Sequence, residues 1–327
     1  MMSKQKTVYV FTQAYNAEKT LSRTIESVLG QVYSNVIYYV ADSASTDNTK
    51  NIITSYAMRD GRVKPIFLTE NLNWEMYNII PEILKTDKTG YFVQIDADDE
   101  YKTDFINKMI DFINDSKLDV AACASAYIDG VTLENKSKLI LEDNILIEGN
   151  QFQTLFGDYF RYFRDSWGKV FSLSLFEKVN FDRLDKSIMN GSVSYLSFEA
   201  LLNAKKIGVY KEALHNYYVY PDSFERNKNS CYRILTPTLY FYYYQYLLNK
   251  CGEISKNNEE FLINSYCNAI CGKIINFDVP SLSIEEQERI FKILTENEFM
   301  TIIKKYEDKK YLERIKKAIS VFDGLEL

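Results

Sequence analysis

A hydrophobic run ends in several carboxylates at one point of the chain. Residues 91–95 read YFVQI, and Asp96, Ala97, Asp98 and Asp99 follow directly. Carboxylates that crowd together without a partner repel one another and hold their protons more tightly. A divalent cation resolves that conflict, because Mg²⁺ and Mn²⁺ prefer oxygen ligands and bind through one or two carboxylates together with phosphate oxygens. The run therefore predicts either a metal–diphosphate site or an acidic turn ahead of the next helix.

The elements that position this run alternate along the first 127 residues. Short β-branched and aromatic runs predict strands at residues 7–11, 36–41, 64–68, 91–95 and 120–127. Amphipathic stretches between them predict helices at residues 16–30, 47–58, 73–84 and 103–114. This alternation is typical of an α/β fold with a mostly parallel sheet covered by helices on both faces. Ligands bind such sheets outside the carboxyl ends of the strands, where polar clusters fall at residues 12–16, 42–47 and 96–99.

The alternation is lost after about residue 151. Residues 167–171 predict a turn, residues 173–179 a short helix and residues 192–206 a longer helix. Edge strands are expected at residues 209–210 and 214–220. Beyond a polar loop the chain predicts helices at residues 232–249, 257–275, 283–296 and 299–320. We therefore expect two domains, an α/β domain over residues 1–226 and a helical C-terminal domain over residues 227–327.

Composition narrows the class of protein. The 327 residues carry a formal net charge of −6, so the chain has no global attraction to nucleic acid. The five cysteines form no CxxC pair and the chain has one histidine, which argues against a zinc site and favours free thiols in a reducing cytoplasm. The N-terminal apolar run is too short for a signal peptide, and no stretch approaches the roughly 18 uncharged apolar residues of a membrane span. We expect a cytoplasmic protein, soluble or peripheral on the inner face of the membrane.

Several motifs occur in an order and spacing that together resemble one family. They are Tyr15–Glu18 (YNAE) with Leu21, residues 27–31 (SVLGQ), residues 42–49 (DSASTDNT), residues 74–78 (WEMYN), residues 95–100 (IDADDE) and residues 167–171 (WGKVF). Over roughly residues 5–225 the chain resembles family 2 glycosyltransferases of the GT-A fold, in the branch that builds bacterial polysaccharide, capsule or glycoprotein glycans. Ala44 stands where that family usually has glycine. The resemblance implies a Rossmann-like nucleotide-diphospho-sugar transferase domain.

The resemblance also implies roles for individual residues. Asp42 would hold the base of the donor, and a carboxylate can accept the imide N–H of uracil, which favours UDP. Thr12, Ala14 and Glu18 would line the base and ribose pocket. Asp96, Ala97 and Asp98 would form the metal–diphosphate site, with Asp96 near the ribose or donor sugar and Asp98 on Mn²⁺ or Mg²⁺. Each assignment has an alternative: Asp42 as a cap of the second helix, or Glu18 as a solvated residue in a first helical turn.

The chain departs from the family at the general base. Inverting members use a carboxylate, usually the Asp of a Glu-Asp pair, to take the proton of the acceptor hydroxyl. Counting back from residues 203–207 (NAKKI) places Ser192 and Val193 at the two acidic positions. The nearest acids are Asp185 and Glu199, with Asp165 as a third candidate, and Glu199 is the preferred replacement, although a mid-helix Glu is most often a solvated or paired surface residue.

Three other features leave alternatives open. His215 is either an additional metal ligand or a packed, hydrogen-bonded strand residue. Residues 304–317 carry seven Lys and Arg beside apolar positions, which predicts a solvated surface helix or a peripheral contact with an anionic membrane. Residues 239–248 (LYFYYYQYLL) predict core packing or a homodimer interface through the C-terminal helices.

The function expected from the resemblance is metal-dependent, inverting transfer of a sugar from a UDP-sugar to a glycan, lipid-linked or protein-linked acceptor. The rival expectation is a degenerate member of the same fold that binds a nucleotide sugar or a partner protein without catalysis. The missing acidic pair favours the rival, whereas Asp42 and the intact IDADD run favour the enzyme.

Overall fold

The computed structural model describes residues 5–71, 75–138, 141–181, 192–221, 237–275, 279, 282–306 and 308–322. The chain divides into two compact units. The first contains the described parts of Met1–Gln151, Asp158–Lys186 and Ser192–Pro221. The second contains Phe152–Gly157 and the described part of Asp222–Leu327. Each unit is described separately below.

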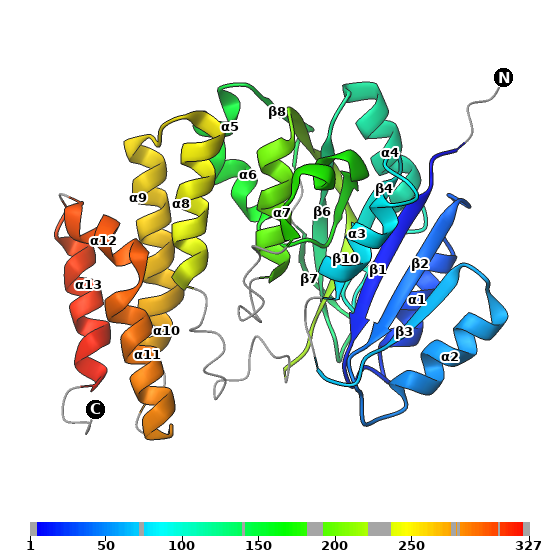
Figure 1. Ribbon diagram of the computed structural model, residues 1–327, viewed down its shortest axis with the longest axis horizontal. Helices are drawn as coiled ribbons and strands as arrows, with labels where there is room; N and C mark the ends of the chain where they lie inside the picture. The colour runs from blue at the N-terminus through cyan, green and yellow to red at the C-terminus, as the bar shows by residue number, and fades with distance from the viewer. Residues whose placement is uncertain are drawn as a thin grey trace. The chain divides into compact units, whose positions relative to one another are not determined.

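Four parallel strands form one half of the sheet in the first unit (Figure 1). They are β1 (Val8–Ala14), β2 (Val36–Asp42), β3 (Val63–Phe67) and β4 (Tyr91–Gln94), in the order β3-β2-β1-β4. Each lies within a few residues of its predicted range. In the register of β1 and β2, Ala14 is opposite Asp42, so these two strands end side by side.

Helices cover both faces of these strands, as the alternation predicted. On one face, α1 (Leu21–Leu29), α2 (Thr49–Arg59) and α4 (Phe105–Ser116) share a hydrophobic core with alternate strand residues such as Tyr91 and Val93. Side chains alternate across a strand, so Phe92 points to the opposite face. There it packs edge to face on Phe176, with ring centroids 5.8 Å apart. Phe176 belongs to the 3₁₀-helix η1 (Leu173–Lys178), which lies beside α3 (Met76–Leu84).

The other half of the sheet is mixed. A short strand, β9 (Lys169–Ser172), lies antiparallel between β4 and β6 (Val120–Asp129). The long strand β10 (Lys206–Val219) runs parallel to β6. The remaining strands pair antiparallel with these two: β5 (Glu100–Tyr101) and β8 (Ile145–Glu148) with β10, and β7 (Asn135–Lys138) with β6.

Two predictions about this half were wrong. The segment predicted as a turn at residues 167–171 contains strand β9. The two predicted edge strands are one strand, β10, and it pairs with β6 along its length. Register shifts between Tyr210 and Ala213 and between Ala213 and His215 explain the second error. Such irregularities interrupt the alternation of polar and apolar residues that identifies a strand in a sequence.

Directly after β8 come α5 (Gln151–Thr154) and α6 (Phe156–Phe163), of which Phe152–Gly157 belong to the second unit, and α7 (Ser192–Asn203) follows η1. The aromatic-rich stretch at residues 151–164 forms α5 and α6. The helix predicted at residues 192–206 forms α7, which contacts η1.

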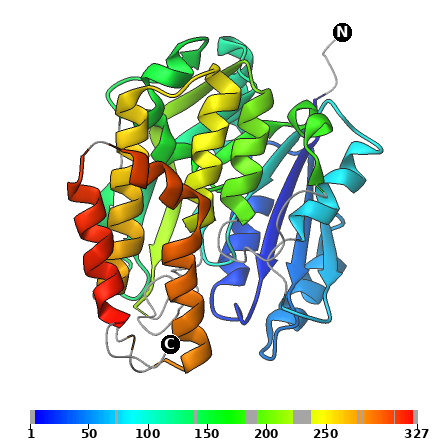
Figure 2. The ribbon, with the colours of Figure 1, turned by 60° about the vertical axis from the view of Figure 1, so that its left-hand side comes forward.

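The second unit is helical (Figure 2). Its helices are α8 (Pro237–Cys251), α9 (Lys256–Tyr266), the π-helix η4 (Cys267–Cys271), α10 (Gly272–Ile275), α11 (Ile284–Glu296), α12 (Glu298–Lys305), α13 (Lys310–Ile319) and the 3₁₀-helix η6 (Ser320–Phe322). The helix predicted at residues 299–320 is broken, because Tyr306 adopts an extended backbone conformation between α12 and α13. Tyr240, Tyr266 and Phe299 pack against one another at the core, with ring centroids 5.4–6.0 Å apart.

The tyrosine-rich stretch of α8 contributes to this core. Leu239, Tyr243, Tyr246 and Leu247 are buried within the chain itself. Among the described helices, none is both long enough and apolar enough to cross a membrane.

Candidate functional site at the carboxyl edge of the sheet

Three strand ends converge at one edge of the sheet. Asp42 ends β2 beside Ala14 at the end of β1, and the backbone N–H of Ile95 donates to Phe11 of β1 at 3.0 Å. Asp96 therefore emerges from β4 next to the ends of β1 and β2. The parallel register thus brings Ala14, Asp42 and Asp96 to the edge where sheets of this kind bind ligands.

Thr12 lies beneath this edge and is fully buried. Its Oγ1 lies 2.9 Å from the hydroxyl oxygen of Tyr38 and donates to the carbonyl oxygen of Ile95 at 2.9 Å. The hydroxyl of Thr12 thus joins β1 to β2 and to the residue after β4. The side chain of Thr12 packs beneath the edge, and Ala14, which is also buried, is the last residue of β1.

The loop after β2 folds back on Asp42. Oδ1 of Asp42 accepts a hydrogen bond from the backbone N–H of Ser45 at 3.2 Å, and 2% of Asp42 is exposed. Between them, Ala44 has a φ of 58°, in the left-handed region that glycine adopts more readily than alanine. The position where the family usually has glycine therefore keeps the glycine-like backbone in this chain.

Glu18 is exposed and joins the two loops that flank the edge. Oε2 of Glu18 accepts the backbone N–H of Asn48 at 3.0 Å, the residue just before α2. In return, the backbone N–H of Glu18 donates to Oδ2 of Asp47 at 3.1 Å, and that of Ala17 donates to Oγ1 of Thr49 at 2.8 Å. Glu18 thus caps the start of α2 from the neighbouring loop, a structural role at the rim of the edge.

The carboxylates of residues 96–99 lie close together, and hydrogen bonds hold the carboxylate of Asp96 in place. Oδ1 of Asp96 accepts a hydrogen bond from Nε2 of Gln94 at 2.7 Å, and the Gln94 amide oxygen accepts one from Ser166. Burial, together with the charges of Asp99 and Asp98, raises the pKa of Asp96 well above its ordinary value. A cation at this point would relieve that repulsion.

The turn itself is held by its backbone. The carbonyl oxygen of Asp98 accepts a hydrogen bond from Nη2 of Arg23 on α1. The guanidinium of Arg23 lies over the ring of Tyr218, 3.5 Å from its centroid. Ala97 packs against the core that α1, α2 and α4 share. As whole residues, Asp96 and Asp98 are both partly exposed in this anchored turn.

The donor set fits a divalent cation of the kind that binds with a diphosphate. Within the described ranges, no three His, Cys, Asp or Glu side chains converge as ready-made metal ligands. Mg²⁺ and Mn²⁺ sites that also use substrate phosphates need only one or two carboxylates. Asp96 and Asp98 supply two, so the residues present are compatible with such an ion.

Asp99 is a site residue to which the sequence analysis assigned no role. Its carboxylate and the ring of His215 are both fully buried, with Oδ2 and Nε2 3.0 Å apart. Oδ1 of Asp99 accepts the backbone N–H of Tyr218 at 2.9 Å, and Nδ1 of His215 lies 3.0 Å from Oγ of Ser125. Burial and the nearby Lys169 lower the pKa of His215 to about 3, so its imidazole is neutral. Both ring nitrogens of His215 lie within hydrogen-bonding distance of a partner, Ser125 or Asp99. His215 is therefore a packed, hydrogen-bonded strand residue, one of the two roles that the sequence left open.

Asp165 lies near the acidic run. Its charge is among those that raise the pKa of Asp96, and its Oδ2 lies 3.2 Å from Nε of Arg164. Two residues later, Trp167 stacks on His215 with ring centroids 4.7 Å apart. The segment 165–169 therefore lies beside residues 96–99. The hydrogen bond between Ser166 and Gln94 also holds this segment next to the end of β4.

Lys169 is an unusual member of this segment, because only 2% of it is exposed. Its Nζ donates to the carbonyl oxygen of Trp167 at 2.9 Å and lies over the ring of the same residue. Burial lowers the pKa of Lys169 to about 8, although the charge of Asp165 acts in the opposite direction.

Glu199 lies on α7, partly buried. Oγ of Ser197 donates to the carbonyl oxygen of Asp165 at 3.0 Å, so that side of α7 faces the segment containing Asp165. Two residues on a helix are about 200° apart, which puts Glu199 on a different side. On that side Asn203 donates to the carbonyl oxygen of Leu175 at 3.1 Å. Ser192 and Val193 begin α7, and Asp185 lies outside the described residues.

Two hollows lie elsewhere in the described parts of the chain. One, of about 590 Å³, lies in the second unit and is lined by residues of α9 and α13. The other, of about 460 Å³, lies in the first unit beside Ala126 and Asn216. Neither is lined by a residue that the sequence predicted for the site.

Comparison with known proteins agrees with this geometry. The family model described as glycosyl transferase family 2 matches residues 9–180, a little more than half of the 327 residues. The chain is 32% identical over 111 residues to WfaP of Escherichia coli, a UDP-Glc:α-D-GlcNAc-diphosphoundecaprenol β-1,3-glucosyltransferase. That alignment covers 34% of this chain and 43% of WfaP, so the chain matches less than half the length of that relative.

Two solved structures have a similar fold. The Staphylococcus aureus TarS fragment 1–349, in complex with UDP, superposes with a TM-score of 0.60 at 18% identity, covering 88% of this chain and 79% of that one. The mannosyltransferase PcManGT of Pyrobaculum calidifontis, in complex with GDP-Man and Mn²⁺, gives a TM-score of 0.52 at 13% identity, covering 98% and 87%. These likenesses confirm the expected GT-A fold with its mostly parallel sheet and helical C-terminal region.

Proposed function

The chain belongs to glycosyl transferase family 2, and we propose that it transfers a sugar from a UDP-sugar to a glycan, lipid-linked or protein-linked acceptor. The observation that carries the proposal is the convergence of Asp42, Asp96 and Asp98 at the carboxyl edge of the sheet. A nucleotide sugar needs a group that reads its base and a group that neutralises its diphosphate, and this edge offers carboxylates for both.

The donor side consists of the ends of β1 and β2. Asp42 is proposed to accept the imide N–H of uracil, with Ala14 and Thr12 forming the adjoining wall and floor. Glu18 is proposed to border the ribose, through the loop that it fastens to α2. Support comes from TarS, whose structure contains UDP, and from the UDP-Glc named for WfaP. The GDP-Man of PcManGT supports the broader class of nucleotide sugars.

Asp98 and Asp96 are proposed to hold Mn²⁺ or Mg²⁺, with Ala97 between them. When bound, the ion would offset the negative charge of the diphosphate as it leaves. Arg23 keeps the turn in place through the carbonyl oxygen of Asp98, and Gln94 orients Asp96. The Mn²⁺ present in PcManGT supports this assignment by analogy of fold.

Asp165 is the base that the geometry favours. In an inverting transfer, the acceptor oxygen bonds to the anomeric carbon while the bond from that carbon to the diphosphate oxygen breaks, and UDP departs with the electron pair. The proton of the acceptor hydroxyl passes to a carboxylate. Asp165 is close enough to Asp96 to act on its pKa, and it directly precedes Ser166, which is hydrogen-bonded to Gln94. Glu199 is the alternative base, and it requires α7 to turn its other side toward the acceptor.

The remaining proposals concern partners. We propose that contact of α13 with a membrane is electrostatic, because the apolar side of this helix is buried through Tyr311, Ile315 and Ala318. A homodimer through the C-terminal helices must use surfaces other than the buried tyrosines of α8.

The test is release of UDP from a panel of UDP-sugars, with and without Mn²⁺ and with candidate acceptors. A donor screen by thermal shift comes first, because a bound donor raises the apparent stability by mass action. Transfer that requires Mn²⁺ supports the proposal. Donor binding without transfer to any acceptor supports the rival, a degenerate protein that only binds nucleotide sugar. Absence of donor binding to the wild type excludes the transferase and leaves only the second form of the rival, a protein of this fold that binds a partner protein.

A further inference from the structure

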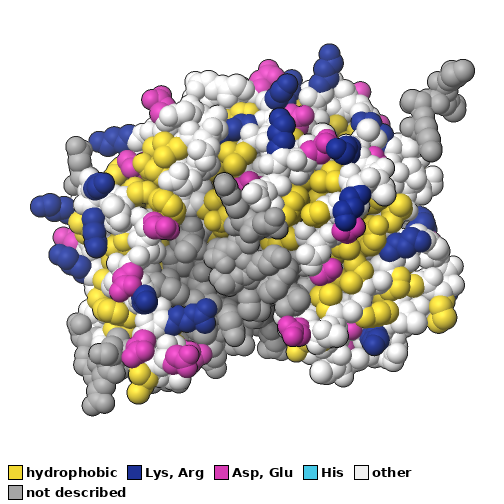
Figure 3. All heavy atoms as spheres, viewed as in Figure 1, with side chains coloured by type: hydrophobic (Ala, Val, Ile, Leu, Met, Phe, Trp, Pro, Cys, Tyr) yellow, Lys and Arg dark blue, Asp and Glu magenta, His cyan; other side chains and the backbone are white. Residues whose placement is uncertain are grey.

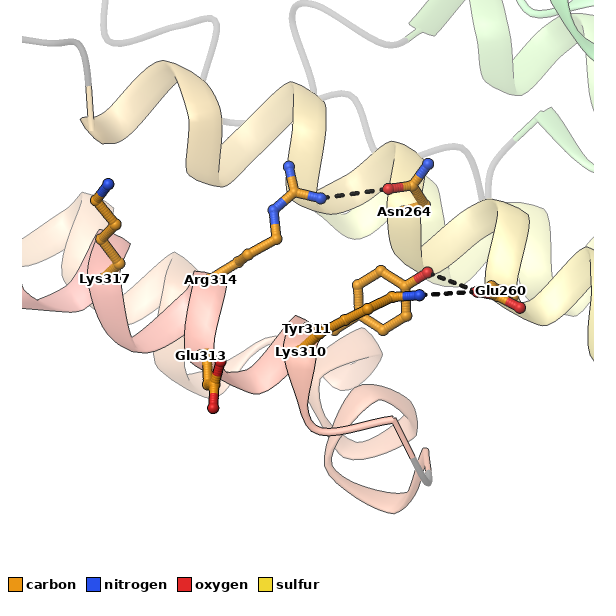
Figure 4. A pocket seen from close by; sticks show the side chains of 7 residues that line it. All are labelled: Glu260, Asn264, Lys310, Tyr311, Glu313, Arg314 and Lys317. Carbon is orange, nitrogen blue, oxygen red and sulfur yellow. Dashed lines mark hydrogen bonds and ion pairs between the residues drawn. The ribbon is translucent and has the colours of Figure 1, made fainter.

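The larger hollow lies in the second unit, between α9 and α13 (Figure 4). Its volume is about 590 Å³. Lys310, Arg314 and Lys317 line it from α13, at spacings of four and three residues that place them on one side of that helix. Glu260 and Asn264 line it from α9. Glu313, also on α13, lines it as well, so the hollow combines three cations with two carboxylates.

Arg314 is held in place by neutral partners. Its Nη1 donates to Oδ1 of Asn264 at 3.2 Å, and its Nη2 donates to Oδ1 of Asn268. Asn268 belongs to the π-helix η4, which continues α9; such wide turns recur at functional sites. Amide oxygens fix the direction of a guanidinium without cancelling its charge. Three of its five N–H donors are not used by these two bonds.

Among the described residues, neither carboxylate of the hollow makes a hydrogen bond or ion pair with Arg314, whose partners are the two amides. The carboxylate of Glu260 is occupied by Nζ of Lys310 at 3.2 Å and by the hydroxyl of Tyr311 at 2.9 Å. Glu313 points away from Arg314, whereas Lys317 points to the same side of α13 as Arg314 (Figure 4). Arg314 and Lys317 therefore form a cationic pair at one end of the hollow. Lys and Arg side chains lie over α12 and α13 with Asp and Glu side chains among them (Figure 3).

We propose that Arg314 and Lys317 form a binding site for a phosphate group. A guanidinium fork and an ammonium are the two groups that recognise phosphate oxygens, the first through paired N–H donors and the second as a point charge. The phosphate belongs to the headgroup of an anionic lipid or to a soluble phosphate compound. The site uses only residues of the second unit, so it does not depend on the proposed donor site.

The experiment measures binding by the full-length wild type to two probes. One is vesicles of phosphatidylglycerol and phosphatidylcholine, with pure phosphatidylcholine vesicles as the neutral control; the other is inorganic pyrophosphate. Lys317→Gln removes one cation of the pair and should weaken binding roughly fivefold, since one Lys near an anionic surface contributes about that factor. Lys316→Gln removes the same charge from an exposed neighbour that does not line the hollow, and it should weaken binding less.

Arg314→Lys keeps the charge and removes the fork, and it should also lose affinity. Unfolding curves of each variant distinguish loss of binding from loss of structure. Selective binding to anionic vesicles identifies a lipid headgroup, and binding to pyrophosphate identifies a soluble ligand. The proposal is overturned if the wild type binds neither probe, or if Lys317→Gln and Lys316→Gln lower the affinity equally. None of these outcomes bears on sugar transfer, which is measured separately.

Discussion

The carboxylate of Asp99 and the imidazole of His215 lie 3.0 Å apart in the interior, 116 residues apart in the sequence. Asp99 belongs to the turn that carries Asp96 and Asp98, and His215 belongs to β10. The pair therefore fastens the acidic turn to the strand that forms the other side of the sheet.

We expect His215→Ala to weaken the fold, because it leaves Asp99 and Ser125 without their shared partner. The loss of unfolding free energy should be about 1–3 kcal/mol, the usual cost of an unsatisfied buried polar group. His215→Gln keeps a donor and should lose less. Urea unfolding of both variants measures the difference. An unchanged midpoint in His215→Ala would mean that the turn is held without this pair.

The proposed metal site predicts a specific loss in Asp98→Asn. The amide keeps the shape of the side chain but lacks the charge that Mn²⁺ requires, so Mn²⁺-dependent donor binding should disappear while the fold persists. Calorimetry with a UDP-sugar, with and without Mn²⁺, measures this. Asp111→Asn, on the exposed side of α4, is the matched control and should bind as the wild type does. Equal affinities in Asp98→Asn and the wild type would remove Asp98 from the metal site.

The proposed contact between Asp42 and the uracil base predicts that Asp42→Ala weakens the binding of UDP far more than the binding of free Mn²⁺. Asp42→Asn keeps an acceptor for the backbone of Ser45 and should preserve the loop while still weakening uracil binding. Titration of each variant with UDP and with Mn²⁺ separates the two effects. If UDP affinity stays within about twofold, roughly 0.4 kcal/mol, Asp42 serves only the loop.

Two amide variants identify the general base that takes the proton of the acceptor. Asp165→Asn should cut turnover by about 10²–10⁴-fold with little change in donor affinity, because a general base acts on the acceptor proton alone. Glu199→Gln should cause the smaller loss. Steady-state turnover at saturating donor measures both. The reverse order would assign the proton to Glu199, and normal transfer by both variants would exclude either side chain as the base.

The buried Lys169 predicts a pH-dependent stability. Its pKa is about 8 in the folded chain and near 10.5 when exposed, so between these values only the unfolded chain binds the proton. The unfolding free energy of the wild type should therefore rise with pH across this window, by about 1.4 kcal/mol per pH unit from this group. Below pH 8 the cost of burying the charge is present in full.

Lys169→Met removes that cost, so we expect the variant to gain most over the wild type near pH 7 and progressively less toward pH 10. Urea unfolding at pH 7, 8.5 and 10 measures the gain. Lys178→Met removes an equal charge from an exposed position and should give a constant difference. A constant difference for Lys169→Met as well would contradict the shifted pKa.

The convergence of Asp42 and Asp96 at one edge of the sheet could be predicted from the sequence because it depends on local signals. Each of β1, β2 and β4 is a short apolar run followed by polar residues, so parallel pairing alone brings Asp42 and Asp96 to one edge. The partnership of Asp99 with His215 carried no such signal, because it depends on how β5 pairs with β10. The side of α7 that faces Asp165 was also unpredictable, since the rotation of a helix about its axis is set by packing and not by its own residues. The full length of β10 could not be predicted, because its register shifts interrupt the alternation of polar and apolar residues.

The position of β9 has a consequence for how this chain folds. β4 and β6 are separated by only 25 residues in the chain, yet they are joined in the sheet through β9, which comes from residues 169–172. During synthesis the first four strands can assemble early, but they can be linked to β6 only after β9 has emerged. Contacts of such long sequence separation form slowly. A chain interrupted before residue 169 would therefore leave unpaired the side of β4 and the parts of β6 that pair with β9 and β10, the kind of open edges on which aggregation begins.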